Sequence, residues 1–206
     1  MKDGLGTGRL EVIAGPMFAG KSEELLRRVR RARVGGRGVL VVSHALDTRR
    51  GAGQVTSHAG AAVASRTAAD AADLSVLVAD GDDGAPVELV AIDEAQFFGP
   101  ALVPVVSELA DRGLVVVVAG LSVTFDGQPF SPLPELMALA ESVEKLTAVC
   151  AVCGADAAFH VRVADVPEGP GGALVPVAAH VGGSESYEAR CRRHVAGQSS
   201  IRGTNR

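Results

Sequence analysis

Apolar residues follow two different patterns along the chain. Four runs, residues 9–14, 38–43, 87–92 and 114–119, are largely apolar and rich in β-branched side chains. Elsewhere, as over residues 22–34 and roughly 101–112, apolar positions recur every three or four residues, which is helical spacing. Strands that are apolar on both faces and alternate with helices are typical of a parallel sheet covered on both sides. The pattern therefore predicts an α/β fold in which helices flank a parallel sheet.

The chain changes character near residue 145. Upstream, the polar residues 47–60 are predicted to form a mobile loop and residues 68–74 a short helix. Downstream, cysteines appear, and two β-type segments, residues 159–163 and 174–178, flank a stretch rich in Gly and Pro. These features predict a small subdomain built on a hairpin or a loop. The expected divisions are residues 1–145, residues 146–197 and a disordered polar tail, residues 198–206.

Composition and charge exclude several classes of protein. The chain has 206 residues, with 20 Lys and Arg against 24 Asp and Glu, giving a formal charge of −4. This mild acidity argues against a protein that coats nucleic acid, so the arginines of residues 27–33 are interpreted as a solvated helix face. No apolar run approaches the ~18 residues of a membrane span, and the N-terminus lacks the apolar core of a signal peptide. We therefore expect a cytoplasmic protein without nucleic-acid or membrane partners.

The most specific motif is a G-x-x-x-x-G-K-S sequence that runs from Gly15 to Ser22. Its glycines allow backbone N–H groups to turn toward phosphate oxygens, Lys21 adds a positive charge, and the Ser22 hydroxyl can bind Mg²⁺. The motif follows a predicted strand and opens a predicted helix, whose N-terminus also favours anions. The sequence therefore predicts a P-loop that binds the phosphates of a nucleotide.

Two acidic residues follow the third predicted strand. Asp93 and Glu94 come directly after the apolar run 87–92. In a parallel sheet this position lies at the same edge as the P-loop, where Asp93 can help to hold Mg²⁺. Glu94 is then available to accept a proton from an attacking hydroxyl or water.

Three cysteines and one histidine have the spacing of a zinc site. Cys150 and Cys153 form one pair, and Cys191 and His194 form a second pair with the same two-residue separation. Four such ligands suffice for a closed tetrahedral site, which leaves no open position for catalysis. A redox pair would leave Cys191 and His194 without a role, and the signature of zinc deaminases is absent. The pattern predicts structural zinc.

The motifs alone leave two enzyme classes open. A GTPase normally carries an Asn-Lys-x-Asp guanine-reading motif, and none of the three lysines, Lys2, Lys21 and Lys145, follows Asn. A helicase or motor needs more chain and usually a more basic surface. A kinase and an ATP-driven switch both fit a P-loop followed by an acidic pair.

The order of the motifs resembles the type II thymidine kinase family. The resemblance covers roughly residues 8–195 and includes GPMFAGKSEELLRRVRR, Asp47-Thr48-Arg49, IDEAQFF (92–98), the segment 124–130, LAESVEKLTAVC (139–150) and GGSESYEARCRRH (182–194). It implies a P-loop, RecA-like parallel sheet flanked by helices, with a small zinc-binding subdomain. It also implies a phosphotransferase that uses ATP to phosphorylate thymidine at its 5′-hydroxyl, giving TMP, and that assembles as a homotetramer. The alternative is an ATP-driven switch with a structural zinc module and no nucleoside acceptor.

The resemblance also implies a role for individual residues. Lys21 and the loop amides would hold the ATP phosphates, Ser22 and Asp93 would serve Mg²⁺, and Glu94 would be the catalytic base. Arg49 would steady charge on the transferred phosphoryl group. The implied P-loop set is Gly15, Pro16, Met17, Phe18, Ala19, Gly20, Lys21 and Ser22. The implied nucleoside-binding set is Met17, Gln96, Phe97, Leu121, Phe125, Phe130, Val181, Gly182, Gly183 and Tyr187. Zinc on Cys150, Cys153, Cys191 and His194 would anchor the loop that reads the base.

Three positions depart from the family pattern. The family often carries Asp where Ser122 stands and an acidic residue where Ala59 stands. His160 occupies a position that is usually Thr or Ser, near the sugar or the base. These departures concern the surroundings of the metal, the loop that covers the site and the polarity of the pocket. They leave Lys21 and the acidic pair unchanged.

Overall fold

A computed structural model describes residues 8–47, 54–56, 62–81, 86–163 and 186–195 of the chain. Its centre is a six-stranded sheet with the order β5-β2-β6-β7-β1-β8, in which every neighbouring pair is parallel. The strands are β1 (Arg9–Gly15), β2 (Val39–His44), β5 (Arg66–Ala68), β6 (Leu89–Ile92), β7 (Val115–Leu121) and β8 (Ser142–Lys145). The predicted α/β fold with a parallel sheet is confirmed.

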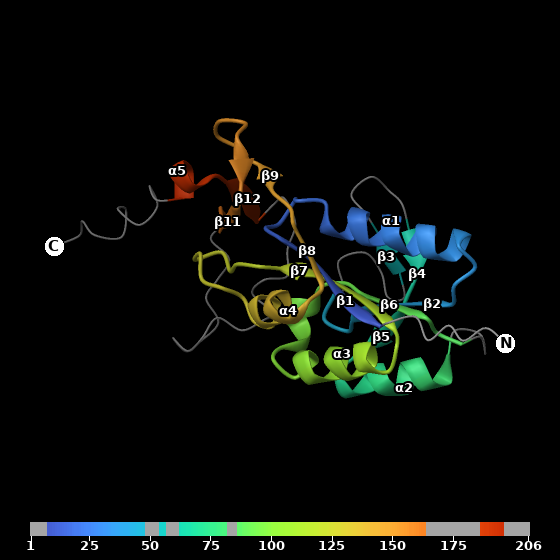
Figure 1. Cartoon of the computed structure of the whole chain (residues 1–206). Coiled ribbons are helices and arrows are strands. Elements are labelled where there is room, and N and C mark those ends of the chain that lie inside the picture. The colour runs from blue at the N-terminus through green and yellow to red at the C-terminus, as the bar shows by residue number, and fades with distance from the viewer. Residues whose placement is uncertain (1–7, 48–53, 57–61, 82–85, 164–185, 196–206) are drawn as a thin grey trace.

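Helices cover both faces of this sheet, as Figure 1 shows. On one face lies α1 (Lys21–Val34), and on the other lie α2 (Ala72–Asp80), α3 (Leu102–Asp111) and α4 (Leu133–Leu139). Successive residues of β1 point to opposite faces, so that Ile13 packs with α1 while Val12 packs with the other three helices. The apolar character of the strands on both sides follows from this sandwich. In the described part of the chain, no helix is both long and apolar enough to cross a bilayer.

A small module follows the sheet in sequence. We use this name for the described residues 148–163 and 186–195. It contains β9 (Ala148–Val149), β10 (Asp156–Ala157), β11 (Phe159–Arg162), β12 (Tyr187–Arg190) and α5 (Arg192–Val195). β9 pairs antiparallel with β10, and β11 with β12. Figure 1 shows these elements in orange and red, grouped together at one end of the sheet.

The local structure differs from the sequence predictions in two segments. The predicted loop 47–60 contains a strand, β3 (Gln54–Thr56), which pairs antiparallel with β4 (Ala62–Ala64). The helix expected over 68–74 begins only at Ala72, because Ala68 extends the sheet in β5. The carboxylate of Asp70 accepts hydrogen bonds from the amides at the start of that helix. The segment 174–178, predicted to be of β type, lies outside the described residues.

Candidate active site

Three strands bring the predicted catalytic residues to one edge of the sheet. β1 leads directly into the glycine-rich loop, β6 ends one residue before Asp93, and β7 ends at Leu121, next to Ser122. β1, β6 and β7 are neighbours and parallel, so their carboxyl ends lie together. Ligands of open α/β sheets bind at this edge.

The glycine-rich loop connects β1 with the first turn of α1. Gly20 has a φ of 82°, a left-handed conformation that glycine adopts without steric cost. At Gly15 an added Cβ atom would lie 2.7 Å from the carbonyl oxygen of Leu146, so only glycine fits there. Lys21, the first residue of α1, is buried, and its Nζ donates to the carbonyl oxygen of Pro16 at 2.7 Å. The loop thus has the strand–loop–helix context that a phosphate-binding loop requires.

Asp93 is buried beside this loop, with 4% of the residue exposed. Its carboxylate accepts hydrogen bonds from the Ser22 hydroxyl and from the backbone N–H of Glu94, the latter at 3.0 Å. Burial, helped by the nearby charge of Glu94, raises the pKa of Asp93 to about 7, although Ser22 and Lys21 act in the opposite direction. Two hard oxygen donors, one of them a carboxylate that needs positive charge, suit Mg²⁺.

Glu94 is held by a buried amide. Its φ of 53° is left-handed, and it stands just before the short 3₁₀ helix η1 (Ala95–Phe98). The Gln96 side-chain nitrogen donates to the Glu94 carboxylate, and the Gln96 oxygen accepts from the backbone N–H of Leu121 at 2.9 Å. Gln96 therefore ties Glu94 to the end of β7, whereas the family resemblance had implied only a nucleoside contact for it.

An apolar cluster lies beside the glycine-rich loop. Three of its residues are buried and come from distant parts of the chain. Two further aromatic residues pack against these three, and so does Phe18 from the glycine-rich loop. The cluster residues are Met17, Leu121 and Tyr187, with Phe125 and Phe130. All five were predicted to contact the nucleoside, and the structure brings them together. Phe97, from the same prediction, packs outside this cluster against the ring of His44, with 5.9 Å between the ring centroids.

One face of β11 adds two residues to the same neighbourhood. The His160 ring meets Tyr187 edge-on, with centroids 5.8 Å apart, and the Arg162 guanidinium lies over the Phe125 ring at 5.9 Å. Arg162 also stands directly opposite Tyr187 in the strand pair. The sequence analysis gave Arg162 no role. The period-two alternation of strand 159–163 places it on the same side as His160 and could have identified it.

Four predicted site residues cannot be placed. Arg49, which was expected to steady the transferred phosphoryl group, lies outside the described residues. So do Val181, Gly182 and Gly183, which were expected to contact the nucleoside.

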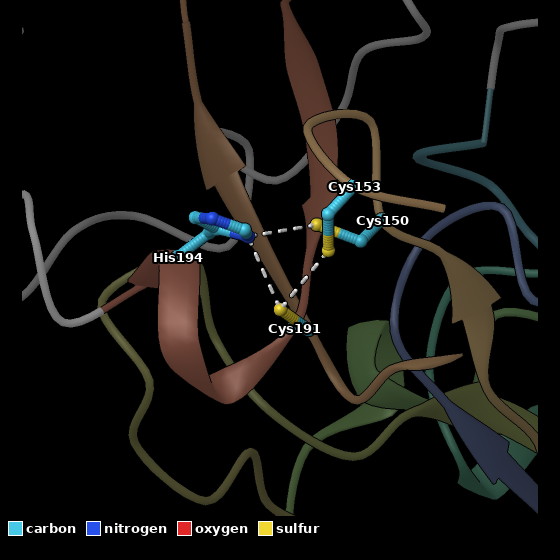
Figure 2. A group of neighbouring side chains, drawn as sticks. All are labelled: Cys150, Cys153, Cys191 and His194. Carbon is cyan, nitrogen blue, oxygen red and sulfur yellow. Dashed lines mark hydrogen bonds between the residues drawn. The ribbon is translucent and has the colours of Figure 1, made fainter. Parts of the chain in front are cut away.

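The predicted zinc ligands converge in the small module, as Figure 2 shows. One ligand atom from each of Cys150, Cys153, Cys191 and His194 lies within 4.8 Å of all the others. The Cys153 and Cys191 sulfurs are 3.8 Å apart, and His194 Nδ1 is 3.3 Å from the Cys191 sulfur. A tetrahedron with Zn–S bonds of ~2.3 Å has edges of roughly 3.8 Å. The three cysteines form no disulfide, so the donor set and its spacing fit zinc.

The backbone around Cys150 prepares this site for a cation. Burial acts to raise the pKa of the Cys150 thiol, but the amide N–H groups of Cys191, Val152 and Cys153, with His194, outweigh it and lower the pKa to about 5. The pKa of Cys153 is raised: the Ala155 amide lowers it, but burial and the neighbouring sulfurs prevail. Since the neighbouring sulfurs raise the pKa of Cys153, its deprotonation beside the Cys150 thiolate requires a bound positive charge.

Comparison with known proteins places the chain in a family. The family model described as thymidine kinase matches residues 8–195. The chain belongs to the thymidine kinase family. It is 47% identical to a thymidine kinase of Deinococcus deserti over 91% of this chain and 94% of the relative. It is 46% identical to one of Deinococcus radiodurans, covering 94% and 92%, and 45% identical to one of Halobacterium salinarum, covering 90% and 93%.

Membership of the thymidine kinase family bears on the open alternatives. The matched region contains the glycine-rich loop, the acidic pair, the apolar cluster and all four metal ligands. A nucleotide switch without a nucleoside acceptor is not favoured by these relatives. One departure from the thymidine kinase pattern is visible in the fold: Ser122 is buried at the end of β7, and its hydroxyl has no hydrogen-bond partner among the described residues.

Proposed function

We propose that the chain transfers the γ-phosphate of ATP to the 5′-hydroxyl of thymidine, producing TMP. The proposal rests on one observation: in this member of the thymidine kinase family, three features lie together at one edge of the sheet. These features are the glycine-rich loop, the acidic pair and the apolar cluster of Met17, Leu121 and Tyr187. A thymine ring needs an apolar slot with a few fixed polar partners, which this arrangement can supply.

The glycine-rich loop and Lys21 bind the ATP phosphates. Lys21 is buried and its ammonium bonds to the loop's own Pro16 carbonyl, so the charge is already held within the loop. Ser22 and Asp93 hold Mg²⁺, which, when bound, neutralises charge on the phosphate oxygens. Arg49 adds a further positive charge to the transferred group in this proposal.

Glu94 accepts the proton of the thymidine 5′-hydroxyl. Its carboxylate is fixed by Gln96, which in turn is fixed by the backbone of β7. A base held in one orientation next to the phosphate loop allows in-line attack of the hydroxyl oxygen on the γ-phosphorus. Phe125, Phe130 and Tyr187 hold the base in this proposal, together with residues 181–183.

Structural zinc on the Cys150, Cys153, Cys191 and His194 set anchors both ends of the loop that reaches the base. β11 and β12 lie on either side of residues 163–186, and the ligands lie just outside these two strands. The proposed division of the chain is accordingly an ATP-binding kinase domain, residues 1–145, and a zinc-binding subdomain, residues 146–197.

The test is a phosphoryl-transfer assay on Glu94→Gln with and without thymidine. Loss of a positioned base typically costs 10²–10⁴-fold in rate, and we expect kcat to fall by about this factor while ATP binding persists. Glu108→Gln, an exposed change on α3, is the matched control. Near wild-type transfer by Glu94→Gln would refute the base assignment. ATP hydrolysis that is indifferent to thymidine would favour the nucleotide switch instead.

The assembly and location that we propose are a homotetramer in the cytoplasm. The tetramer is inferred from the family, and the location from the use of ATP and from cysteines arranged as metal ligands rather than disulfides. Light scattering on the purified protein measures the assembly directly; a monomeric mass would contradict it.

A further inference from the structure

Phe18 occupies an unusual backbone conformation in the middle of the glycine-rich loop. Its φ is 66°, and among the described residues only Glu94 is another non-glycine residue with a positive φ. The left-handed region is unfavourable for a residue with a bulky side chain, because the Cβ atom approaches the following carbonyl oxygen. Such a conformation persists only where the surroundings hold it. The loop that receives the phosphates therefore depends on whatever holds Phe18.

Two apolar clusters contact Phe18. With Ala19, it packs against the core of the small module, which consists of Ala148, Cys150, Ala157, Ala189 and Cys191. It also packs against the cluster of Met17, Leu121 and Tyr187. Two residues of the module core, Cys150 and Cys191, are ligands of the zinc site. Phe18 thus lies in the phosphate loop and packs against the same apolar core to which these two ligands belong.

The chain segment that enters the module contacts the loop at its beginning. The backbone N–H of Leu146, two residues before β9, donates to the carbonyl oxygen of Ala14 at 2.8 Å. The carbonyl oxygen of Leu146 lies so close to Gly15 that no side chain fits between them. The chain entering the module therefore fixes the first residue of the loop, and the module core fixes its middle.

We propose that Phe18 is a positioning residue through which the zinc-loaded module holds the phosphate loop in its ATP-binding conformation. Zinc occupancy and ATP affinity are then coupled even when no nucleoside is bound. This goes beyond anchoring of the base-reading loop, which would link zinc to thymidine alone. The coupling rests on the zinc and ATP sites of the proposed function. By linkage it is reciprocal, so ATP also raises the affinity of the module for zinc.

The experiment measures ATP affinity by calorimetry, without thymidine, in four proteins: wild type, Phe18→Ala, Cys153→Ser and the double variant. Cys153 is the exposed ligand, and its loss should perturb the fold least. We expect each single variant to weaken ATP binding about tenfold, within the 5–150-fold range of coupled sites. The double variant should weaken it hardly further, because both changes remove the same support. Phe18→Leu, which keeps apolar bulk, should recover part of the affinity.

Two controls separate coupling from general damage. Val149→Ala changes a module side chain that is 71% exposed, and it should leave both zinc content and ATP affinity unchanged. Zinc content and the unfolding midpoint are measured for every variant. In zinc-loaded Phe18→Ala, amide hydrogen exchange should accelerate in residues 15–20 while the amides of β7 stay protected.

Several results would overturn the proposal. They are wild-type ATP affinity in Phe18→Ala, wild-type affinity in metal-free Cys153→Ser, and independent, multiplicative losses in the double variant. If Cys153→Ser does not fold, unchanged hydrogen exchange in the loop of Phe18→Ala decides against the proposal. A wild-type protein that binds no ATP or no zinc would refute the proposed function. Binding of both without coupling would refute only the role of Phe18.

Discussion

The parallel sheet and the small module fill their interiors with different kinds of side chain. β1 and β7 are each seven residues long, and large aliphatic residues such as Ile13, Leu25 and Leu136 are fully buried between sheet and helices. The module pairs strands of two or four residues, and the buried cluster that contains its cysteines consists, among the described residues, of three alanines and two cysteines. Apolar burial can stabilise the sheet, and the described part of the module buries far fewer large aliphatic side chains.

This difference suggests that the sheet and the module obtain their folding stability in different ways, the module through its metal. In the sheet, each buried aliphatic side chain contributes ~1.5–3 kcal/mol by leaving water. In the module, four ligands from two segments of the chain meet at one point, and metal binding there is also folding free energy. Two regions of one chain thus have separate sources of stability. Changes to one source should leave the other region largely intact.

The largest effect is expected from Cys191→Ser, which removes a buried zinc ligand. Structural zinc sites bind with apparent free energies of ~10–16 kcal/mol, so the module should lose its fixed structure. Amides of residues 148–162 and 187–195 should exchange rapidly with solvent while those of β1 and β7 remain protected. Val152→Ala, an exposed change between two ligands, is the control. If the module amides stayed protected from hydrogen exchange without metal, the module would not depend on zinc for its structure, contrary to this comparison.

A smaller effect, on the other region, is expected from Leu25→Ala. Leu25 on α1 is fully buried against the sheet, and truncation of such a leucine costs about 2–5 kcal/mol. Urea denaturation should show this loss, and the folded variant should retain zinc in the wild-type ratio. Val34→Ala lies on the same helix but is 89% exposed, and should change stability by less than about 0.5 kcal/mol. Zinc loss from folded Leu25→Ala would show that the regions are not separate.

The features that were predicted best from the sequence are those determined by residues close together along the chain. The runs that became β1, β2, β6 and β7 are recognisable because a strand buried on both faces must be apolar throughout. The metal site was predictable because each pair of ligands is only two residues apart. β8 (Ser142–Lys145) was missed, since an edge strand is exposed and its sequence is polar. The three-residue strands β3, β4 and β5 are too short to show any period.

What the sequence could not predict are contacts between distant segments. No local pattern indicates that Gln96 joins Glu94 to β7, because Leu121 contributes only its backbone to that bond. The packing of Phe18 against the small module likewise depends on residues more than a hundred positions away. The motif predicted that Asp93 binds Mg²⁺, but the burial of Asp93, and hence the raised pKa of its carboxyl, could be seen only in the fold.

The smallest predicted effect concerns the parallel sheet: protonation of Asp93 should weaken magnesium binding. Because burial raises the pKa of Asp93 to about 7, the carboxyl carries a proton below that pH, which bound Mg²⁺ must displace. Apparent magnesium affinity in the presence of ATP should therefore be constant above about pH 7 and fall up to tenfold per pH unit below it, about 1.4 kcal/mol per unit. Asp93→Asn should bind magnesium weakly and lose this dependence, as magnesium titrations from about pH 6 to about pH 8 would show. Zinc content should stay constant over the same range, since the cation charge stabilises the thiolates of the module. A wild-type magnesium affinity that does not change with pH would contradict the role of Asp93.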